Sequence, residues 1–140
     1  MTATLDPSTK GGAHALERLE NEKIGWLTTV NADGQPQSSP LWFLWMDDEI
    51  FVYSATTAPR TRNLAQNPRV AFNLQTDPGG YEMVTIEGIA RIDPEGPPCS
   101  QHPAYLAKYA RLLEDWGGPE FMDRDYPVVI RITPTRWRTG

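Results

Sequence analysis

The stretch from Ile24 to Ser54 reads IGWLTTVNADGQPQSSPLWFLWMDDEIFVYS and alternates strand-like segments with turns. Its first segment, residues 24–30, is rich in the β-branched and aromatic side chains that favour strands. Residues 31–34 end in Gly34, which can adopt the positive φ that a tight turn requires. The pattern predicts a hairpin at this point.

The two following segments extend the hairpin into a β-meander. Residues 35–45 predict one long strand, bent near Pro36 or Pro40, because proline has no N–H to give to a ladder. An acidic turn separates it from a third strand over residues 49–54.

The rest of the chain adds helices and three more strands. Gly88 interrupts the second of these strands and predicts a bulge or a close backbone approach. Helices are expected over residues 13–22, 59–67 and 103–116, and strands over residues 70–75, 81–92 and 126–133. Six strands, several joined by tight turns, predict an α+β protein built on a six-stranded closed or split β-barrel.

Length and composition predict one domain. The chain has 140 residues, which suits a single core. Residues 1–12 are polar and are expected to form a flexible N-terminus, so the barrel domain is assigned to residues 13–140. A domain of this size buries a limited part of its surface, which makes a dimer interface plausible.

The charge pattern excludes some partners. The net charge is −5, whereas nucleic-acid-binding domains usually carry a basic face. No apolar run is long enough to span a membrane, and no apolar signal region begins the chain, so a cytoplasmic location is expected. Against this acidic background, residues 59–76 carry three arginines and no acid, which indicates a local anion site.

The anion site is predicted at the start of the short helix after Pro59. Helix N-termini attract phosphate through free N–H groups, and Ser54, Thr56 and Thr61 add hydroxyl groups nearby. Thr56 or the next threonine is the expected N-cap. Arg60 is favoured over Arg62 as the phosphate ligand because it lies in the first turn. On composition alone, an ordinary capped surface helix with solvated arginines accounts for this segment better than an anion site does.

A second candidate segment is the polar run from Gln37 to Trp42. Small polar residues in mid-strand are unusual for a core strand, and they could contact the edge of a planar ligand. From this segment alone, a solvated strand face is the better explanation. Alternation gives one face to Gln37, Ser39 and Leu41, and the other to Ser38, Pro40 and Trp42.

Other candidate sites are weak. His14 and His102 are far apart, lack the spacing of metal ligands and are expected at the surface, so no metal site is predicted. The single cysteine, Cys99, excludes an internal disulfide. The chain carries no glycine-rich dinucleotide fingerprint.

Several of these segments together resemble the pyridoxamine 5'-phosphate oxidase-like split-barrel superfamily, and most closely its actinobacterial flavin/deazaflavin oxidoreductases of the B type. The resemblance covers nearly the whole chain. It is carried by residues 24–30, 33–40, 53–54, 60–70, 87–90 and 130–138, among which the RTRNLAQNPRV block at 60–70 is the most specific.

The resemblance implies a homodimer with two cofactor sites at its interface. The phosphate would be held by Arg60, Thr61 and Asn63, with Ser54 and Thr56 nearby. Many relatives have lysine at the position of Arg60.

The cofactor's ring system would lie along the second strand, at Gln37, Ser38 and Pro40, and aromatic residues of the partner chain, here Trp116 and Trp137, would close the site.

The implied function is an oxidoreductase that transfers hydride from a bound deazaflavin (F420) to a small unsaturated organic acceptor, with FMN as the alternative cofactor. A non-catalytic flavin- or deazaflavin-binding or storage protein would use the same residues. A haem-handling barrel ranks last, because His14 and His102 are poor candidates for an axial ligand.

Overall fold

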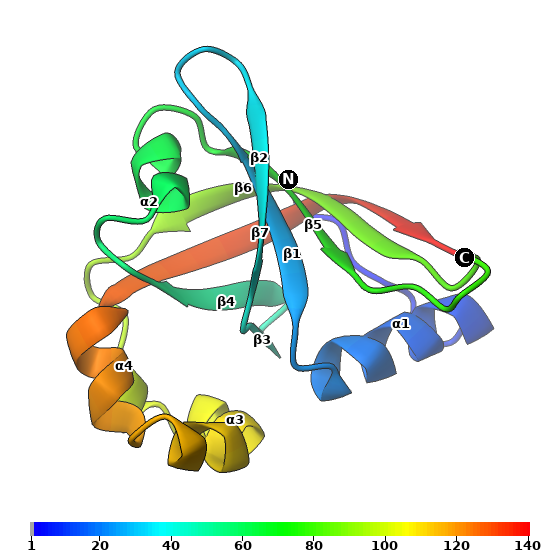
Figure 1. The fold of residues 1–140 in the computed structure, drawn as a ribbon. Helices are drawn as coiled ribbons and strands as arrows, with labels where there is room; N and C mark the ends of the chain where they lie inside the picture. The colour runs from blue at the N-terminus through cyan, green and yellow to red at the C-terminus, as the bar shows by residue number, and fades with distance from the viewer. Residues whose placement is uncertain (1) are drawn as a thin grey trace.

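A computed structural model describes residues 2–140 (Figure 1). Its helices are α1 (Lys10–Asn21), α2 (Pro59–Leu64), α3 (Pro103–Asp115) and α4 (Pro119–Asp125), with a 3₁₀ turn, η1 (Cys99–Gln101). Its strands are β1 (Gly25–Val30), β2 (Pro36–Leu41), β3 (Leu44–Met46), β4 (Glu49–Ser54), β5 (Arg69–Leu74), β6 (Val84–Ile92) and β7 (Val128–Thr139).

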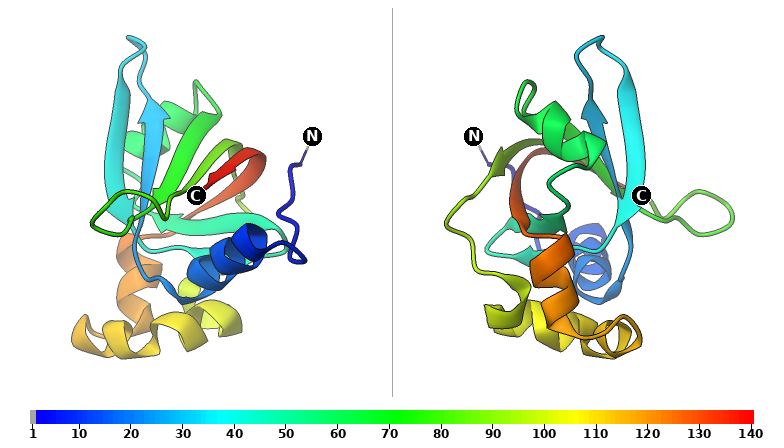
Figure 2. Two further views of the ribbon diagram at one scale, coloured as in Figure 1. Left: turned by 90° about the vertical axis from the view of Figure 1, so that its right-hand side faces the viewer. Right: turned by 60° about the vertical axis from the view of Figure 1, so that its left-hand side comes forward.

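The seven strands form one antiparallel sheet in the order β2-β1-β5-β6-β7-β4-β3. Strands β2 and β3 lie at opposite edges of this sheet, yet only two residues separate them in the chain. Three peptide steps span at most about 11 Å. The sheet must therefore curl until its two edges meet at this corner, which gives the half-barrel visible in Figures 1 and 2.

The same corner corrects the prediction of six strands. The long strand expected over residues 35–45 is interrupted at Trp42 and Phe43, so it becomes β2 and β3. The backbone of Phe43 bonds side chains of α3 instead of a neighbouring strand: its N–H donates to the Tyr109 hydroxyl at 2.8 Å, and its carbonyl accepts from Lys108 Nζ at 2.8 Å. A contact across more than 60 residues thus ends the strand.

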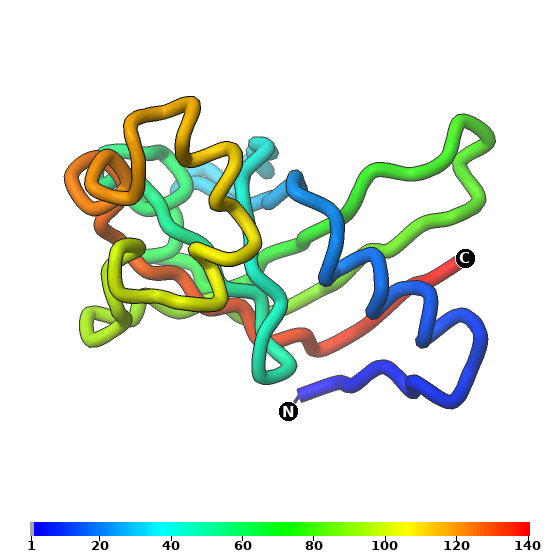
Figure 3. The backbone as a smooth tube through the Cα atoms, turned by 90° about the horizontal axis from the view of Figure 1, so that it is seen from below, coloured from blue at the N-terminus to red at the C-terminus, as the bar shows by residue number. Residues whose placement is uncertain are grey.

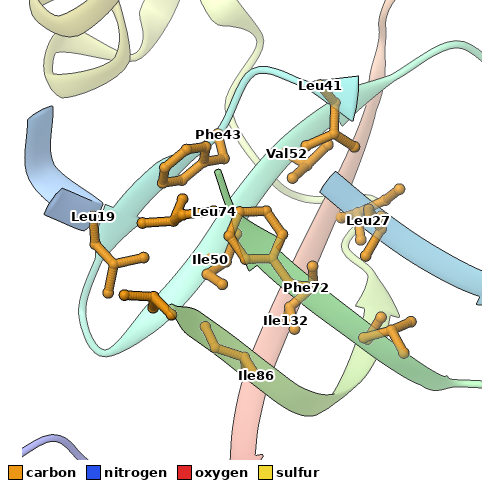
Figure 4. Packing of buried hydrophobic residues seen from close by; sticks show 14 of the residues in the cluster. Leu19, Leu27, Leu41, Phe43, Ile50, Val52, Phe72, Leu74, Ile86 and Ile132 are labelled. Atoms are coloured by element: carbon orange, nitrogen blue, oxygen red, sulfur yellow. The ribbon is translucent and has the colours of Figure 1, made fainter. Parts of the chain in front are cut away.

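Apolar side chains fill the concave face of the half-barrel (Figure 4). Leu19 reaches this cluster from α1, so the helix closes one end of the barrel. The fully buried members include Leu27, Phe43, Ile50, Val52, Phe72, Leu74, Ile86, Ile130 and Ile132. Burying each such side chain contributes roughly 1.5–3 kcal/mol, so this cluster is the main source of stability.

A second cluster lies on the other face of β4 and β7, where α3, α4 and η1 cover the sheet. Tyr105 and Tyr109 of α3 are fully buried there, against Phe51 and Tyr53 of β4. Helix α1 and the α3–α4 pair both lie at the lower end of the molecule in Figure 1, and the view from below shows the α3–α4 pair on the left and α1 on the right (Figure 3).

Two local predictions can be compared with the backbone. Gly88 lies at a register shift between β6 and β7, and a Cβ there would meet the Thr133 carbonyl oxygen at 2.8 Å, so the predicted bulge is confirmed. The first helix begins at Lys10 rather than at residue 13, and the Ala3 N–H donates to the Pro134 carbonyl at 2.8 Å. The flexibility predicted for residues 1–12, of which Met1 lies outside the described residues, stays a prediction.

None of the helices within residues 2–140 has the length and apolar character needed to cross a membrane.

Candidate anion-binding site around Arg60

Helix α2 follows β4 and lies against β1 and β6 (Figure 2). The expected threonine cap is wrong: the N-cap residue is Ala58, whose side chain makes no cap bond, while Thr56 and Thr57 lie exposed in the preceding turn. With only six residues, α2 has a small dipole. Any attraction for an anion must therefore come mainly from side chains.

Arg60 supplies that charge. Its half-buried guanidinium donates from Nε to Ser54 Oγ at 2.9 Å and from Nη1 to Ser39 Oγ at 3.3 Å. Within residues 2–140 no carboxylate lies at ion-pair distance from it. Burial lowers the pKa of Arg60, an effect that nearby Tyr126 opposes, but arginine stays charged in proteins. Two of its five N–H donors are used, which leaves three.

Two buried hydroxyl groups lie behind Arg60. Ser54 is fully buried and Thr61 is 9% exposed, and their oxygens are 2.9 Å apart. Thr61 Oγ1 also donates to the Ala55 carbonyl at 2.8 Å. The structure thus brings Ser54, Arg60 and Thr61 together, as predicted, but turns the two hydroxyl groups toward the protein.

Asn63 connects α2 to the first two strands. Its Nδ2 donates to Thr29 Oγ1 and to Gln37 Oε1, both at 2.9 Å. Gln37 is exposed, and with its Oε1 accepting from Asn63 its own amide N–H groups point elsewhere. The predicted residues Gln37 and Asn63 are therefore neighbours beside Arg60.

The alternation of β2 separates the remaining candidates. Ser39 faces Arg60, whereas Ser38 lies on the opposite face, where its Oγ is 2.6 Å from Thr28 Oγ1. Pro40 shares the face of Ser38 and is exposed. Ser39 was not among the predicted site residues, although the alternation that placed it beside Gln37 was a signal for it.

The two predicted tryptophans lie in different places. Trp116, 61% exposed, stacks on Phe121 with ring centroids 6.5 Å apart, and Phe121 contacts Tyr126 at 5.6 Å. Tyr126, the last member of this aromatic row, is close enough to Arg60 to act on its pKa, and it was missed from sequence. Trp137 packs against Trp45 at 5.5 Å, and its Nε1 donates to the Ala3 carbonyl. Trp137 is therefore not part of the group around Arg60 in the same chain.

His102 corrects the expectation of a surface residue, since it is only 7% exposed. Its Nδ1 accepts from the Tyr105 N–H at 3.3 Å and caps α3, and its ring contacts Phe51 at 4.8 Å. Burial lowers its pKa, and the nearby Arg131 acts in the same direction. Within residues 2–140, no three His, Cys, Asp or Glu side chains are grouped as metal ligands would be.

Comparison with known proteins gives one family match over most of the chain. The family model described as pyridoxamine 5'-phosphate oxidase matches residues 12–139. A solved structure of an F420 reductase is 28% identical, with a TM-score of 0.66, over 89% of this chain and 95% of that one.

Two other solved structures share the fold at lower identity. An FAD-binding protein from Mesorhizobium loti is 19% identical, with a TM-score of 0.68, over 98% of this chain and 93% of that one. HutZ, the heme storage protein from Vibrio cholerae, is 22% identical, with a TM-score of 0.64, over 98% and 95%.

Proposed function

The chain belongs to the pyridoxamine 5'-phosphate oxidase family, and from this premise we propose that it is an oxidoreductase. It binds a phosphate-bearing cofactor, F420 or alternatively FMN, at Arg60, and uses it to transfer hydride to a small unsaturated organic acceptor. The cofactor would supply the redox chemistry, and the protein would supply binding, orientation and exclusion of water.

One observation carries the proposal: Arg60 is a half-buried cation with no carboxylate partner within residues 2–140. Partial burial of a charge is unfavourable unless the charge is compensated. A bound phosphate would compensate it through the free N–H donors of the guanidinium, whose planar fork matches two phosphate oxygens.

Other residues of the site would act on the same cofactor. Ser39 accepts from Arg60, so its own proton remains available for a phosphate oxygen. The amide N–H groups of Gln37 are turned away from Asn63 and would meet an acceptor on the ring edge. We keep three exposed residues as proposed contacts: Ser38 and Pro40, on the face of β2 opposite to Arg60, and Thr56, in the turn before α2.

F420 is the preferred cofactor in this proposal. An F420 reductase of similar length is 28% identical to the chain. Both F420 and FMN carry a phosphate and a planar tricyclic ring, so the group around Arg60 suits either, and binding must decide between them.

We also propose that the active unit is a homodimer. One face of the sheet exposes Trp26 of β1 (37%) and Ile89 of β6 (42%). Large apolar side chains on an open sheet face are typical of an interaction surface. Trp26 lies opposite Pro40 in the β1–β2 register, so a second copy here would cover the proposed ring contacts. Trp116 and Trp137 remain candidates for closing the partner's site.

Anaerobic titration of F420 and of FMN, followed by fluorescence, tests the binding part. We expect Arg60→Ala to lower the affinity for the cofactor by about tenfold or more, because one charge-assisted hydrogen bond contributes roughly 1.5–3 kcal/mol. Arg62→Ala is the matched control, since Arg62 lies on the same helix but is exposed and, among residues 2–140, its side chain bonds only the Thr57 carbonyl. Equal affinity of Arg60→Ala and the native protein would overturn the phosphate assignment.

An acceptor screen tests the catalytic part. Reduced cofactor is mixed with quinones, tetrapyrroles and enones, and its oxidation is followed by absorbance. Oxidation that depends on both protein and acceptor supports a reductase. Tight binding with no oxidation by any acceptor would instead favour the storage or binding protein.

A further inference from the structure

We propose that Ser54 and Thr61 are positioning residues that fix the guanidinium of Arg60 through a directed chain of hydrogen bonds, and that neither hydroxyl group donates to the ligand. The inference rests on the proposed function, because it concerns how the anion-binding arginine is held. It reassigns two residues that the family resemblance places among the phosphate contacts.

The direction of each bond follows from chemistry. Arg60 Nε can only donate, so Ser54 Oγ accepts from it at 2.9 Å. The Ala55 carbonyl can only accept, so the Thr61 proton goes to it at 2.8 Å. The contact of 2.9 Å between the two hydroxyl oxygens must then use the Ser54 proton. Every proton in this hydrogen-bond chain, from Arg60 Nε to the Ala55 carbonyl, is therefore donated to an acceptor within the protein.

Burial supports the same conclusion. Ser54 has no exposed surface and Thr61 is 9% exposed, so a ligand in solution could reach Ser54 only after a rearrangement. The hydrogen-bond chain holds the Nε side of the guanidinium toward the protein, and Ser39 Oγ accepts from Nη1 at 3.3 Å. Both N–H groups of Nη2 are left without a partner within residues 2–140 and are the donors offered to an anion.

Lysine at position 60 would not reproduce this arrangement, since it has no Nε–H fixed at an angle to its terminal donors. The prediction is therefore a coupling between Ser54 and the guanidinium. Ser54→Ala should lower the affinity for FMN or F420 roughly two- to tenfold, which is the range expected for the loss of one neutral hydrogen bond. In an Arg60→Lys background, the same substitution should change the affinity by less than about twofold.

A spectroscopic measurement tests this hydrogen-bond chain without any ligand. In ¹H–¹⁵N spectra, the Arg60 Nε–H signal is assigned by its loss in Arg60→Lys. It should exchange slowly with solvent in the native protein and in Thr61→Ser, which keeps the hydroxyl. It should exchange faster in Ser54→Ala and in Thr61→Val, which has nearly the same shape but no hydroxyl. Urea unfolding of the same variants checks that they remain folded.

The outcomes separate this inference from the proposed function. Unchanged exchange of the Arg60 Nε–H in both Ser54→Ala and Thr61→Val would overturn the positioning chain. So would an equal loss of affinity on Ser54→Ala in the native and Arg60→Lys backgrounds, because that loss would not pass through the guanidinium. If Arg60→Ala alone leaves the affinity unchanged, the proposed function fails, whatever the exchange rates are.

Discussion

Two tyrosines of α3, one turn apart, differ in what their hydroxyl groups contact. The Tyr109 hydroxyl accepts from the Phe43 N–H and lies 2.8 Å from the Lys23 and Phe43 carbonyl oxygens. The Tyr105 hydroxyl is buried and has no hydrogen-bond partner within residues 2–140. Leaving a buried polar group unpaired is unfavourable, so the two hydroxyl groups should have opposite effects on stability.

We expect Tyr105→Phe to leave the free energy of unfolding unchanged or raise it by up to about 1 kcal/mol. Tyr109→Phe should lower it by about 1–3 kcal/mol, because the Phe43 N–H at the barrel corner then loses its acceptor. Urea unfolding of both variants measures the difference. Comparable destabilisation by the two substitutions would contradict this account.

At the candidate site, the sequence indicated which segments come together but not how their side chains bond one another, and ligand binding there stays a prediction. The basic window and the polar run of β2 do meet at Arg60, as the contacts of Ser39 and Gln37 with α2 show. The roles of Ser54 and Thr61 depend on burial and on hydrogen bonds that cross from β4 to α2. Spacing along one chain carries no information on such contacts.

At the scale of elements, α3 depends on a titratable cap. His102 Nδ1 accepts from the Tyr105 N–H, and burial lowers the pKa of His102, opposed by a backbone hydrogen bond and assisted by Arg131. A protonated imidazole has two donors and no acceptor, so it cannot cap the helix. Because the folded pKa lies below the ordinary value of about 6.5, the unfolded chain binds more protons between these two pKa values.

The free energy of unfolding should therefore fall as the pH drops below about 6.5, until the folded pKa of His102 is passed. Urea unfolding at pH values between 7.5 and 5 measures this slope. His102→Asn is the control, since asparagine also caps helices but does not titrate. A slope that is as steep in His102→Asn as in the native protein would assign the pH dependence to other groups.

Most elements could be predicted from local patterns, because strand alternation, turn glycines and helix stops act within a few residues. The helix ending at Asp115, before Gly117 and Gly118 with positive φ, is an example. The division of one predicted strand into β2 and β3 could not be predicted, since Tyr109 and Lys108 cause it from a distant helix. The burial of His102 has the same kind of cause, in its packing against Phe51.

For the whole molecule, the curled sheet has consequences for assembly. Curling places the apolar cluster inside and leaves the convex side of β1, β5 and β6 open, except where helices cover the sheet. Trp26 lies opposite Asn73, and Asn73 lies opposite Thr85, so the three residues share one continuous surface on which Trp26 is exposed and the other two are half-buried.

If this surface forms the proposed homodimer, light scattering after size exclusion should give about twice the chain mass of 15.7 kDa. Trp26→Glu should shift the mass to that of a monomer, because a charge on each copy would be buried at a symmetric interface. The fold should survive, since Trp26 is 37% exposed and lies outside the core.

Met46→Glu, at the opposite edge of the sheet and similarly exposed, should leave the mass unchanged. A native protein that stays monomeric at roughly 100 times the concentration used for cofactor titration would refute the dimer, and a Trp26→Glu variant that stays dimeric would place its interface elsewhere.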